Sequence, residues 1–335
     1  MSALTIFLII ACHQNPATQP KTTLENRSDL ASVDSTCQTI SHDAGTITVC
    51  GQPERVVALD PHAMDLLLSL EVQPIGYAEV EVALLKSFNL GAPMQVKYLG
   101  DRMTQSPKFI GTRNQPSLEA ILKLQPDLIV GEDATNYDAL SRIAPTLLLA
   151  GTEANRWQKN IQTLAQVFEA QETAQAVIAA HNQKIAAVRA TLAPVVAQKR
   201  ALLLATDGFS FTAFHDKQDY AGNLLRNLGI SLIAVGGLGD KRYPNLSLEV
   251  LPQLEADLIF VMTASNNTVD AERERWQQNA VLRSLCAYQN NQVYFVDYQL
   301  WSRIRGAIAA DLIVDNVQEL LNAEISHFSD RQQIR

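Results

Sequence analysis

Residues 156–192 read RWQKNIQTLAQVFEAQETAQAVIAAHNQKIAAVRATL. The stretch contains no Gly and no Pro and is rich in Ala and Gln, which are good helix formers. Its apolar residues recur at the three- and four-residue spacing of one helix face. The stretch therefore predicts a long helix in the middle of the chain, with a break near Gln171 and an end just before Pro194.

The same pattern lies on both sides of this helix. Before it, residues 117–131 read SLEAILKLQPDLIVG, and after it, residues 247–261 read SLEVLPQLEADLIFV. In both segments a Ser that can cap a helix precedes Leu-Glu, a short apolar helix and a buried strand. The apolar runs 55–59 and 200–205 begin the two copies, and alternating strands and helices predict right-handed βαβ units.

The first residues have the pattern of an export signal. Residues 3–11, ALTIFLIIA, are apolar, are too short to span a bilayer, and precede Cys12 and a polar stretch. Residues 9–12, IIAC, resemble a bacterial lipobox, in which the Cys becomes the lipidated first residue of the mature protein. We therefore expect Cys12 to carry a lipid anchor in the periplasm, rather than residues 3–11 to form a buried strand.

The predicted fold class is α/β, with two lobes joined by a single long α-helix, and each lobe a mainly parallel sheet flanked by helices. A chain of 335 residues is long enough for two such lobes. A helix is a stiff hinge, so ligand binding should flex the lobes only slightly. The expected segments are the signal and lipobox (1–12), a disordered tether (13–35), the N-terminal lobe (36–155), the helical linker (156–193), the C-terminal lobe (194–322) and a polar tail (323–335).

Export allows the cysteines to form disulfides. Cys37 and Cys50 flank an alternating segment, whose pattern predicts a hairpin that turns at 42–45. The hairpin puts Cys37 opposite Cys50, so a disulfide is sterically reasonable, and no nearby His or Cys completes a four-ligand metal site. Cys286 is left over, and we expect it to be a buried free thiol.

These features together resemble the class of periplasmic binding proteins for ferric siderophores, ferric citrate, haem and vitamin B12, in which one long helix joins two α/β lobes. The resemblance extends from about Cys37 to Leu321, and the ferric-citrate and siderophore branch is the most similar. The segments that carry it are GTRNQPSLE (111–119), QPDLI (125–129), VYFVD (293–297), Trp301 and RGAIAA (305–310). The resemblance implies a monomeric protein without catalytic residues or a cofactor. Such a protein delivers a ferric citrate or ferric siderophore to the permease of an ABC importer.

Two glutamates occupy equivalent positions in the repeated pattern. Glu119 and Glu249 each lie in the first turn of a predicted helix, where the helix dipole stabilises a carboxylate by about 0.3–1 kcal/mol. In the resembled class the matching glutamates, one on each lobe, pair with arginines of the permease. We therefore expect Glu119 and Glu249 to orient the protein on its importer as well as to stabilise their helices.

The ligand of an open α/β sheet binds at the carboxyl ends of the parallel strands, so we expect it between the lobes. Arginine forks bind carboxylate and catecholate oxygens, and aromatic faces pack on the flat parts of a chelate. The expected ligand-binding residues are Arg102, Arg113, Tyr137, Tyr298, Trp301, Arg303 and Arg305. Among them Tyr298, Trp301 and Arg303 are the strongest candidates, because their position after a strand and the resemblance agree.

Other functions fit the sequence less well. A haem- or cobalamin-binding protein of the same fold could use Tyr137 or Tyr298 on haem iron, but several arginines suit a polyanionic chelate better. A zinc- or manganese-binding protein needs about three converging His or carboxylate ligands, whereas the six histidines are scattered. A metal-chelatase-like enzyme needs a metal-insertion pair, and the sequence has no P-loop, nucleophile elbow or GxGxxG motif. The net charge of −8 argues against a nucleic-acid partner.

Overall fold

The computed structural model of the chain describes residues 37–79, 98–133, 135–208, 210–215, 217, 219–235, 244–263 and 267–333, with side chains up to residue 322. Met1–Ser35 and Thr36–Arg335 are separate units. The predicted signal, lipid anchor at Cys12 and tether lie outside the described residues. Within the described ranges, no helix has both the length and the apolar character that a membrane crossing requires.

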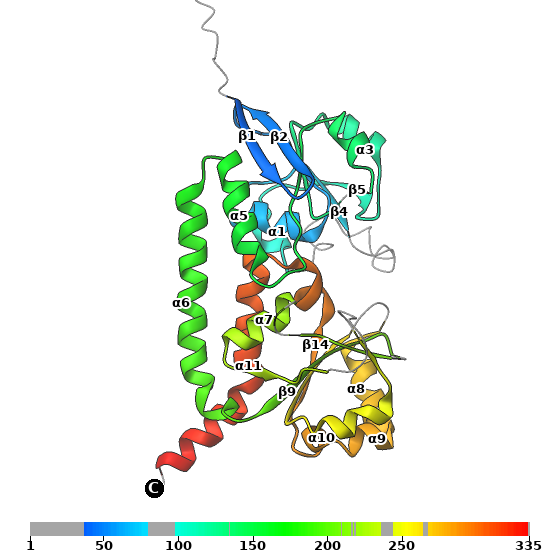
Figure 1. The fold of residues 1–335 in the computed structure, drawn as a ribbon, viewed down its shortest axis with the longest axis vertical. Coiled ribbons are helices and arrows are strands. Elements are labelled where there is room, and N and C mark those ends of the chain that lie inside the picture. Colours follow the sequence, from blue (N-terminus) through cyan, green and yellow to red (C-terminus); the bar gives the residue numbers. More distant parts are fainter. Residues whose placement is uncertain are drawn as a thin grey trace, which may run out of the picture. The chain divides into compact units, whose positions relative to one another are not determined.

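The first lobe is built on a six-stranded sheet of order β6-β5-β4-β3-β7-β8, in which only β5 and β6 are antiparallel neighbours. Helices lie beside the strands (Figure 1). The strands are β3 (Val56–Ala58), β4 (Gly76–Glu79), β5 (Lys108–Thr112), β6 (Gln115–Pro116), β7 (Leu128–Gly131) and β8 (Thr146–Leu148). The helices are α1 (Pro61–Ser69), the 3₁₀ helix Gly100–Arg102, α3 (Leu118–Leu124), α4 (Tyr137–Ser141) and α5 (Arg156–Val167).

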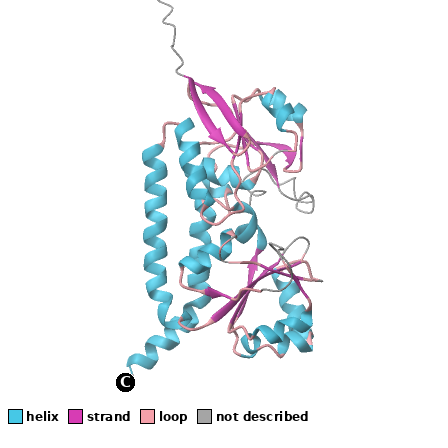
Figure 2. Cartoon of the chain, in the orientation of Figure 1, coloured by secondary structure: helices cyan, strands magenta, loops and turns pink. Residues whose placement is uncertain are grey.

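The second lobe has a sheet of order β12-β10-β9-β13-β14, with β11 also paired to β9. Strands β9, β13 and β14 are parallel, so the predicted α/β class with two mainly parallel sheets is confirmed (Figure 2). The strands are β9 (Arg200–Thr206), β10 (Phe211–Ala213), β11 (Ser231–Leu232), β12 (Asn245–Leu246), β13 (Leu258–Thr263) and β14 (Val293–Asp297). The helices are α7 (Tyr220–Asn227), the 3₁₀ helix Leu248–Leu254, α8 (Val269–Gln278), α9 (Ala280–Arg283), α10 (Cys286–Gln289), the π-helical turn Gln299–Ile304 and α11 (Ala307–Gln333).

The repeated sequence pattern makes the same local structure twice. In the first lobe the Asp127 carboxylate accepts the Arg55 backbone N–H at 2.9 Å, and the Arg55 side chain donates to the carbonyl of Gln125. Gln125 has a left-handed φ of 46°, which ends α3 and turns the chain into β7. The second lobe repeats these contacts at Arg200, Glu255 (φ 47°) and Asp257.

The segment predicted as one linker helix forms two helices. α5 ends at Val167 and α6 (Gln171–Val196) follows, so the predicted break near Gln171 is confirmed. α5 packs against α1 and against β1 (Cys37–His42) of the first lobe, and α6 alone, the long green helix of Figure 1, joins the lobes. The predicted end before Pro194 is wrong. The helix continues to Val196, because burial of the last two valines outweighs the hydrogen bond that proline cannot donate.

The predicted hairpin is confirmed as β1 (Cys37–His42) and β2 (Gly45–Cys50), and a disulfide joins Cys37 to Cys50. Its turn is fixed to the first lobe, because Asp43 accepts the Ala150 N–H at 2.7 Å and forms an ion pair with Arg156. The expectation of a buried Cys286 is wrong. This residue starts the four-residue helix α10, and its thiol is exposed.

Helix α11 begins where the lobes meet. The first N–H groups of a helix have no partner within the helix. Here the Asp65 carboxylate, on α1 of the first lobe, accepts the N–H groups of Ile308 at 2.9 Å and Ala309 at 2.8 Å. Asp65 is fully buried, and burial raises its pKa to about 6, so the group is ionised at pH 7. The expected polar tail is not a separate segment, because α11 continues through Gln333.

The close approach of Asp65 to the start of α11 leaves no room for a side chain at Gly306. A Cβ atom at Gly306 would lie 2.2 Å from Cγ of Asp65, so Gly306→Ala should lower the free energy of unfolding by about 1–3 kcal/mol or more. Urea denaturation measures this loss. In an Asp65→Gly background, where the whole colliding side chain, Cβ included, is absent, the same substitution should cost much less. An equal loss in both backgrounds would show that the carboxylate is not the cause.

Candidate functional site

A cavity of about 360 Å³ is lined by residues of both lobes. Arg113 follows β5 in the first lobe, whereas Asp207 follows β9 and Tyr298 follows β14 in the second. The cavity therefore lies at the carboxyl ends of parallel strands, where open α/β sheets bind their ligands. Its other lining residues are Thr152, Ala205, Thr206, Ser210, Thr212, Phe214, Ser302, Arg303 and Arg305.

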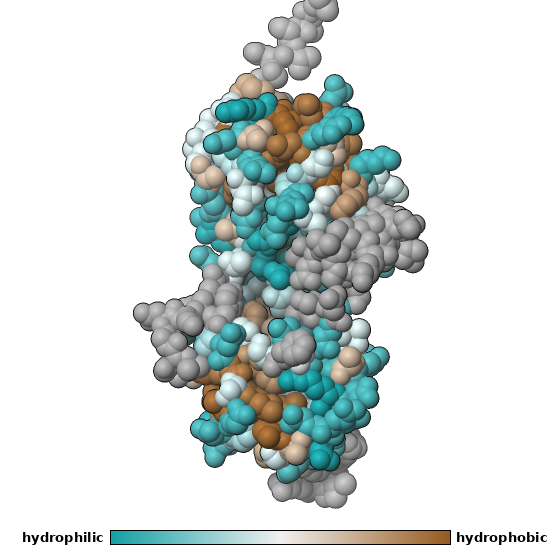
Figure 3. All heavy atoms as spheres, turned by 90° about the vertical axis from the view of Figure 1, so that its right-hand side faces the viewer, coloured by the Kyte–Doolittle hydropathy of each residue, from teal (hydrophilic) through white to brown (hydrophobic). Residues whose placement is uncertain are grey.

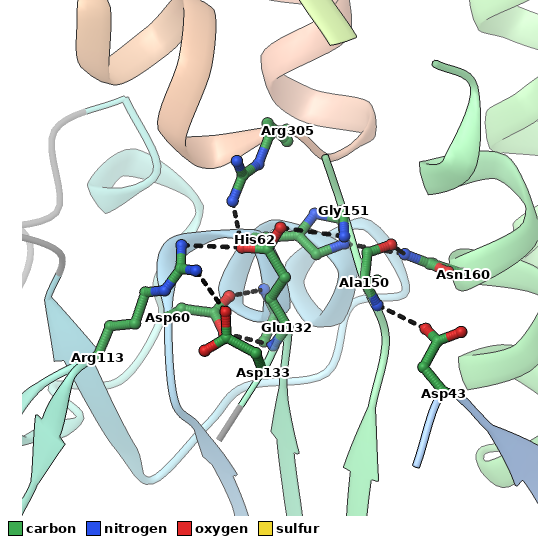
Figure 4. Close-up of polar contacts among 11 residues, drawn as sticks. Asp43, Asp60, His62, Arg113, Glu132, Asp133, Ala150, Gly151, Asn160 and Arg305 are labelled. Carbon is green, nitrogen blue, oxygen red and sulfur yellow. Dashed lines mark hydrogen bonds and ion pairs between the residues drawn. The ribbon is translucent and has the colours of Figure 1, made fainter. Parts of the chain in front are cut away.

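Arg113, Arg305 and Glu132 form a buried ion cluster next to this cavity (Figure 4). Nη1 of Arg113 lies 2.9 Å from Oε2 of Glu132, and Nη2 of Arg305 contacts the same oxygen. The other oxygen, Oε1, accepts the Gly151 N–H at 3.1 Å. Only 3% of the Glu132 side chain is exposed. One carboxylate thus joins arginines that come from opposite lobes.

The pKa values in this cluster reflect burial and ion pairing. Burial by itself would raise the pKa of Glu132, but Arg305 and Arg113 are among the groups that hold it below its ordinary value. Burial lowers the pKa of Arg305, and Glu132 opposes that shift. For Arg113, burial is outweighed by the neighbouring carboxylates, led by Glu132, which raise its pKa. The ion pairs with Glu132 thus favour the charged form of both arginines, and the arginines favour the charged form of Glu132.

The backbone of Arg305 is also constrained. Its φ is 60°, in the left-handed region that costs a non-glycine residue about 1–2 kcal/mol. The residue follows the π-helical turn Gln299–Ile304 and precedes Gly306, whose carbonyl accepts the Tyr220 hydroxyl at 2.5 Å. The ion pair with Glu132 on one side and these contacts on the other hold Arg305 in this conformation.

Asp60, the N-cap of α1, and His62, in its first turn, support the cluster. The Asp60 carboxylate accepts the N–H groups of Ala63 at 2.8 Å and of Glu132 at 2.5 Å. Nε2 of His62 lies 3.0 Å from the Asn160 amide, and burial lowers the pKa of His62 to about 4. This imidazole is therefore neutral at pH 7 and has a structural role beneath the cleft.

Four of the predicted ligand-binding residues line the cavity, namely Arg113, Tyr298, Arg303 and Arg305. The Arg303 guanidinium lies 4.9 Å from the centre of the Tyr298 ring, in a cation–π contact. Trp301 is different. It has no exposed surface, and its Nε1 donates to Asn316 at 3.1 Å. Trp301 does not line this cavity, because the π-helical turn directs its ring into the core.

Neither Arg102 nor Tyr137 belongs to the described lining of the cavity. Arg102 is exposed on its 3₁₀ helix, where its carbonyl accepts the Gln73 amide. The Tyr137 hydroxyl lies 3.3 Å from Nε2 of His42, on the β1–β2 hairpin. The structure therefore gives Tyr137 a contact with the hairpin and leaves Arg102 outside the cavity wall.

Glu132 was not predicted from the sequence, although a signal was present. It follows β7 directly, at the end of the repeated strand pattern, where polar residues reach the ligand edge of a sheet. The hydroxyl-bearing residues of the wall lack such a signal, because Ser and Thr are common in any loop. These residues are Thr152, Ser210, Thr212 and Ser302.

The two predicted docking glutamates are exposed, one on each lobe. Glu119 lies in the first turn of α3, with 78% of its side chain exposed and Lys123 at 2.6 Å. Ser117 caps this helix, as predicted, by accepting the Ala120 N–H. Glu249 lies in a 3₁₀ helix, Leu248–Leu254, instead of the predicted α-helix, and Pro252 lies inside this helix.

Among the described residues, no three His, Cys, Asp or Glu side chains are grouped in a way that could hold a metal ion.

Comparison with known proteins identifies the family. Residues 56–300 match the family described as Periplasmic binding protein. YhfQ of Bacillus subtilis, a putative ABC transporter substrate-binding lipoprotein, is 29% identical over 85% of this chain and 88% of its own length. FecB of Escherichia coli, an Fe(3+) dicitrate-binding periplasmic protein, is 28% identical over 85% of this chain and 90% of its own. The chain belongs to the periplasmic binding protein family.

A solved structure agrees with this assignment. Staphylococcus aureus SirA complexed with staphyloferrin B superposes with a TM-score of 0.69 and 26% identity. The match covers 85% of this chain and 98% of SirA. The two-lobed α/β architecture is therefore that of a substrate-binding protein.

The buried His62 predicts acid sensitivity. Its pKa is about 4 in the folded protein and 6.5 when exposed, so the unfolded chain binds more protons between these values. The contribution of His62 to the free energy of unfolding is therefore complete above pH 6.5 and is lost as the pH falls toward 4. Between pH 7 and pH 5 this residue should reduce the free energy of unfolding by about 2 kcal/mol.

Urea denaturation of the wild type and of His62→Gln at both pH values measures this effect. The variant should be less stable at pH 7, because glutamine does not reproduce the packing of the His62 ring against Gly151. Its free energy of unfolding should fall less on acidification. Equal falls in the two proteins would mean that burial does not lower the pKa of His62, because a group with the same pKa in both states adds nothing to the pH dependence of stability.

Proposed function

We propose that this protein binds a ferric citrate or ferric siderophore in the cavity between its lobes and delivers it to the permease of an ABC importer. The observation that carries the proposal is the convergence of Arg113, Arg303 and Arg305, from both lobes, on one cavity. Guanidinium forks bind carboxylate and catecholate oxygens in pairs, and Tyr298 offers an aromatic face. The names of the relatives FecB and YhfQ support the same function.

The proposed setting is the bacterial periplasm, with a lipid on Cys12 as the membrane anchor. Relatives named as a lipoprotein and as a periplasmic protein support this location. The iron enters and leaves inside its chelate, so the mechanism needs no cofactor and no catalytic step. A single copy of the chain supplies both walls of the cavity, which is consistent with a monomer.

Docking on the importer is proposed to use Glu119 and Glu249. They occupy equivalent positions in the two lobes, and opposite charges across an interface orient the partners. Leu122, one turn after Glu119 on α3, is 60% exposed. Figure 3 views the side that carries α3, and apolar side chains gather there on both lobes, with hydrophilic ones between them.

Ligand binding is tested by titrating the intrinsic tryptophan fluorescence of residues 36–335 with ferric citrate, a ferric hydroxamate, a ferric catecholate, haem and cobalamin. One ferric chelate should quench the signal saturably. Arg303→Gln should weaken its binding about tenfold or more, since a hydrogen bond to a charged group contributes about 1.5–3 kcal/mol. Arg102→Gln, outside the cavity wall, should bind like the wild type. Quenching by haem or cobalamin alone, or by none of the five, would contradict the proposal.

Docking is tested separately. The double variant Glu119→Ala/Glu249→Ala should keep the wild-type affinity for the chelate but lose most of its stimulation of ATP hydrolysis by the reconstituted importer. Glu153→Ala, another exposed glutamate with 65% of its side chain accessible, is the control and should stimulate normally. A double variant that loses chelate affinity instead would place these glutamates in ligand binding.

A further inference from the structure

We propose that Glu132 is a positioning residue of the cleft, which holds Arg113 and Arg305 at the mutual geometry in which they receive an anionic ligand. The inference rests on the proposed function, because it concerns how the same cavity recognises a charged chelate. It differs from that function in assigning a role to a residue that the ligand does not touch.

The burial of the three side chains separates the carboxylate from the ligand. Arg113 and Arg305 line the cavity, with 16% and 8% of their side chains exposed. Glu132 is not one of the described lining residues, and its exposed fraction is only 3%. The guanidinium groups therefore form the wall, and Glu132 lies behind them. A ligand in the cavity would meet the arginines without displacing the carboxylate.

The shared oxygen fixes the distance between two like charges. Both guanidinium groups contact Oε2 of Glu132, so they lie close together although they belong to different lobes. In a poorly solvated site such a pair repels strongly unless a counter-ion lies between its members. Without Glu132, we expect Arg113 and Arg305 to move apart. An anion in the cavity could then bind only one of the two guanidinium groups at a time.

The hydrogen bonds show why only a carboxylate serves here. Oε1 of Glu132 accepts from the Gly151 N–H, and Oε2 accepts from both arginines, so both oxygens act as acceptors. A glutamine has nearly the same shape but replaces one oxygen with a donor amide. In either orientation that amide would face a donor, either the Gly151 N–H or the arginines.

Asp133 provides a matched control beside it in the sequence. Its carboxylate lies 2.6 Å from Nη2 of Arg113, but 62% of its side chain is exposed. Within the described contacts it pairs with the arginine of the first lobe alone. Asp133→Asn therefore removes one negative charge from the region, as Glu132→Gln does. It leaves the ion pairs of Glu132 with Arg113 and Arg305 in place.

The experiment compares the affinities of the wild type, Glu132→Gln and Asp133→Asn for ferric citrate, an anionic probe, and for an uncharged ferric hydroxamate. Glu132→Gln should weaken ferric citrate binding at least tenfold, and Asp133→Asn less than threefold. Any affinity for the uncharged chelate should change less than threefold in both variants. Tighter binding of ferric citrate by Glu132→Gln would overturn the proposal, because Glu132 would then compete with the ligand. Equal losses in the two variants would overturn it as well.

A double-mutant cycle tests whether Glu132 acts through Arg305. If it does, Glu132→Gln added to Arg305→Met should weaken ferric citrate binding no further than Arg305→Met alone. The double variant also removes one charge of each sign, so it remains informative if Glu132→Gln alone folds poorly. Independent, additive losses would overturn the positioning role.

A ligand-free measurement separates this inference from the proposed function. In ¹⁵N NMR spectra of arginine side chains, the N–H hydrogens of the Arg305 guanidinium should exchange slowly with water in the wild type and in Asp133→Asn. In Glu132→Gln they should exchange rapidly. If the wild type bound no ferric chelate, the proposed function would fail, and these spectra would still decide whether Glu132 holds the arginine. Slow exchange of Arg305 in Glu132→Gln would refute the inference.

Discussion

Two buried carboxylates of the first lobe, Asp65 and Glu132, hold the short segment 305–309 of the second lobe. Asp65 accepts the first N–H groups of α11, and Glu132 accepts the side chain of Arg305. These contacts supply the acceptors that a helix start and a buried guanidinium require in the absence of water. The position of α11, the left-handed backbone of Arg305 and one wall of the cavity all depend on them.

This arrangement explains how a cleft can be rich in arginine and still be stable. Isolated buried guanidinium groups would be too costly, whereas an ion pair with further hydrogen bonds is tolerated. Arg113 and Arg305 pair with Glu132 behind the wall, while Arg303 lies over the Tyr298 ring. The donors are therefore held in place before a ligand arrives, and little ordering remains to oppose its binding.

The repeated architecture places equivalent groups on both lobes. Each copy closes its strand–helix unit with an Arg–Asp contact and a left-handed residue before the strand. The exposed glutamates Glu119 and Glu249 follow from the same repeat, because each lies just after the Ser that precedes its short helix.

The sequence by itself determined whatever depends on local order along the chain. The repeated pattern, the break near Gln171 and the Cys37–Cys50 hairpin could all be predicted, because periodicity, turns and short loops are encoded by neighbouring residues. Tertiary structure alone decided which post-strand side chains face the cavity. Trp301 turns inward and Arg303 outward, although only one residue separates them, because the π-helical turn and the core of the second lobe orient them. Glu132 acquires its place only when Arg305, 173 residues further along, folds back against it.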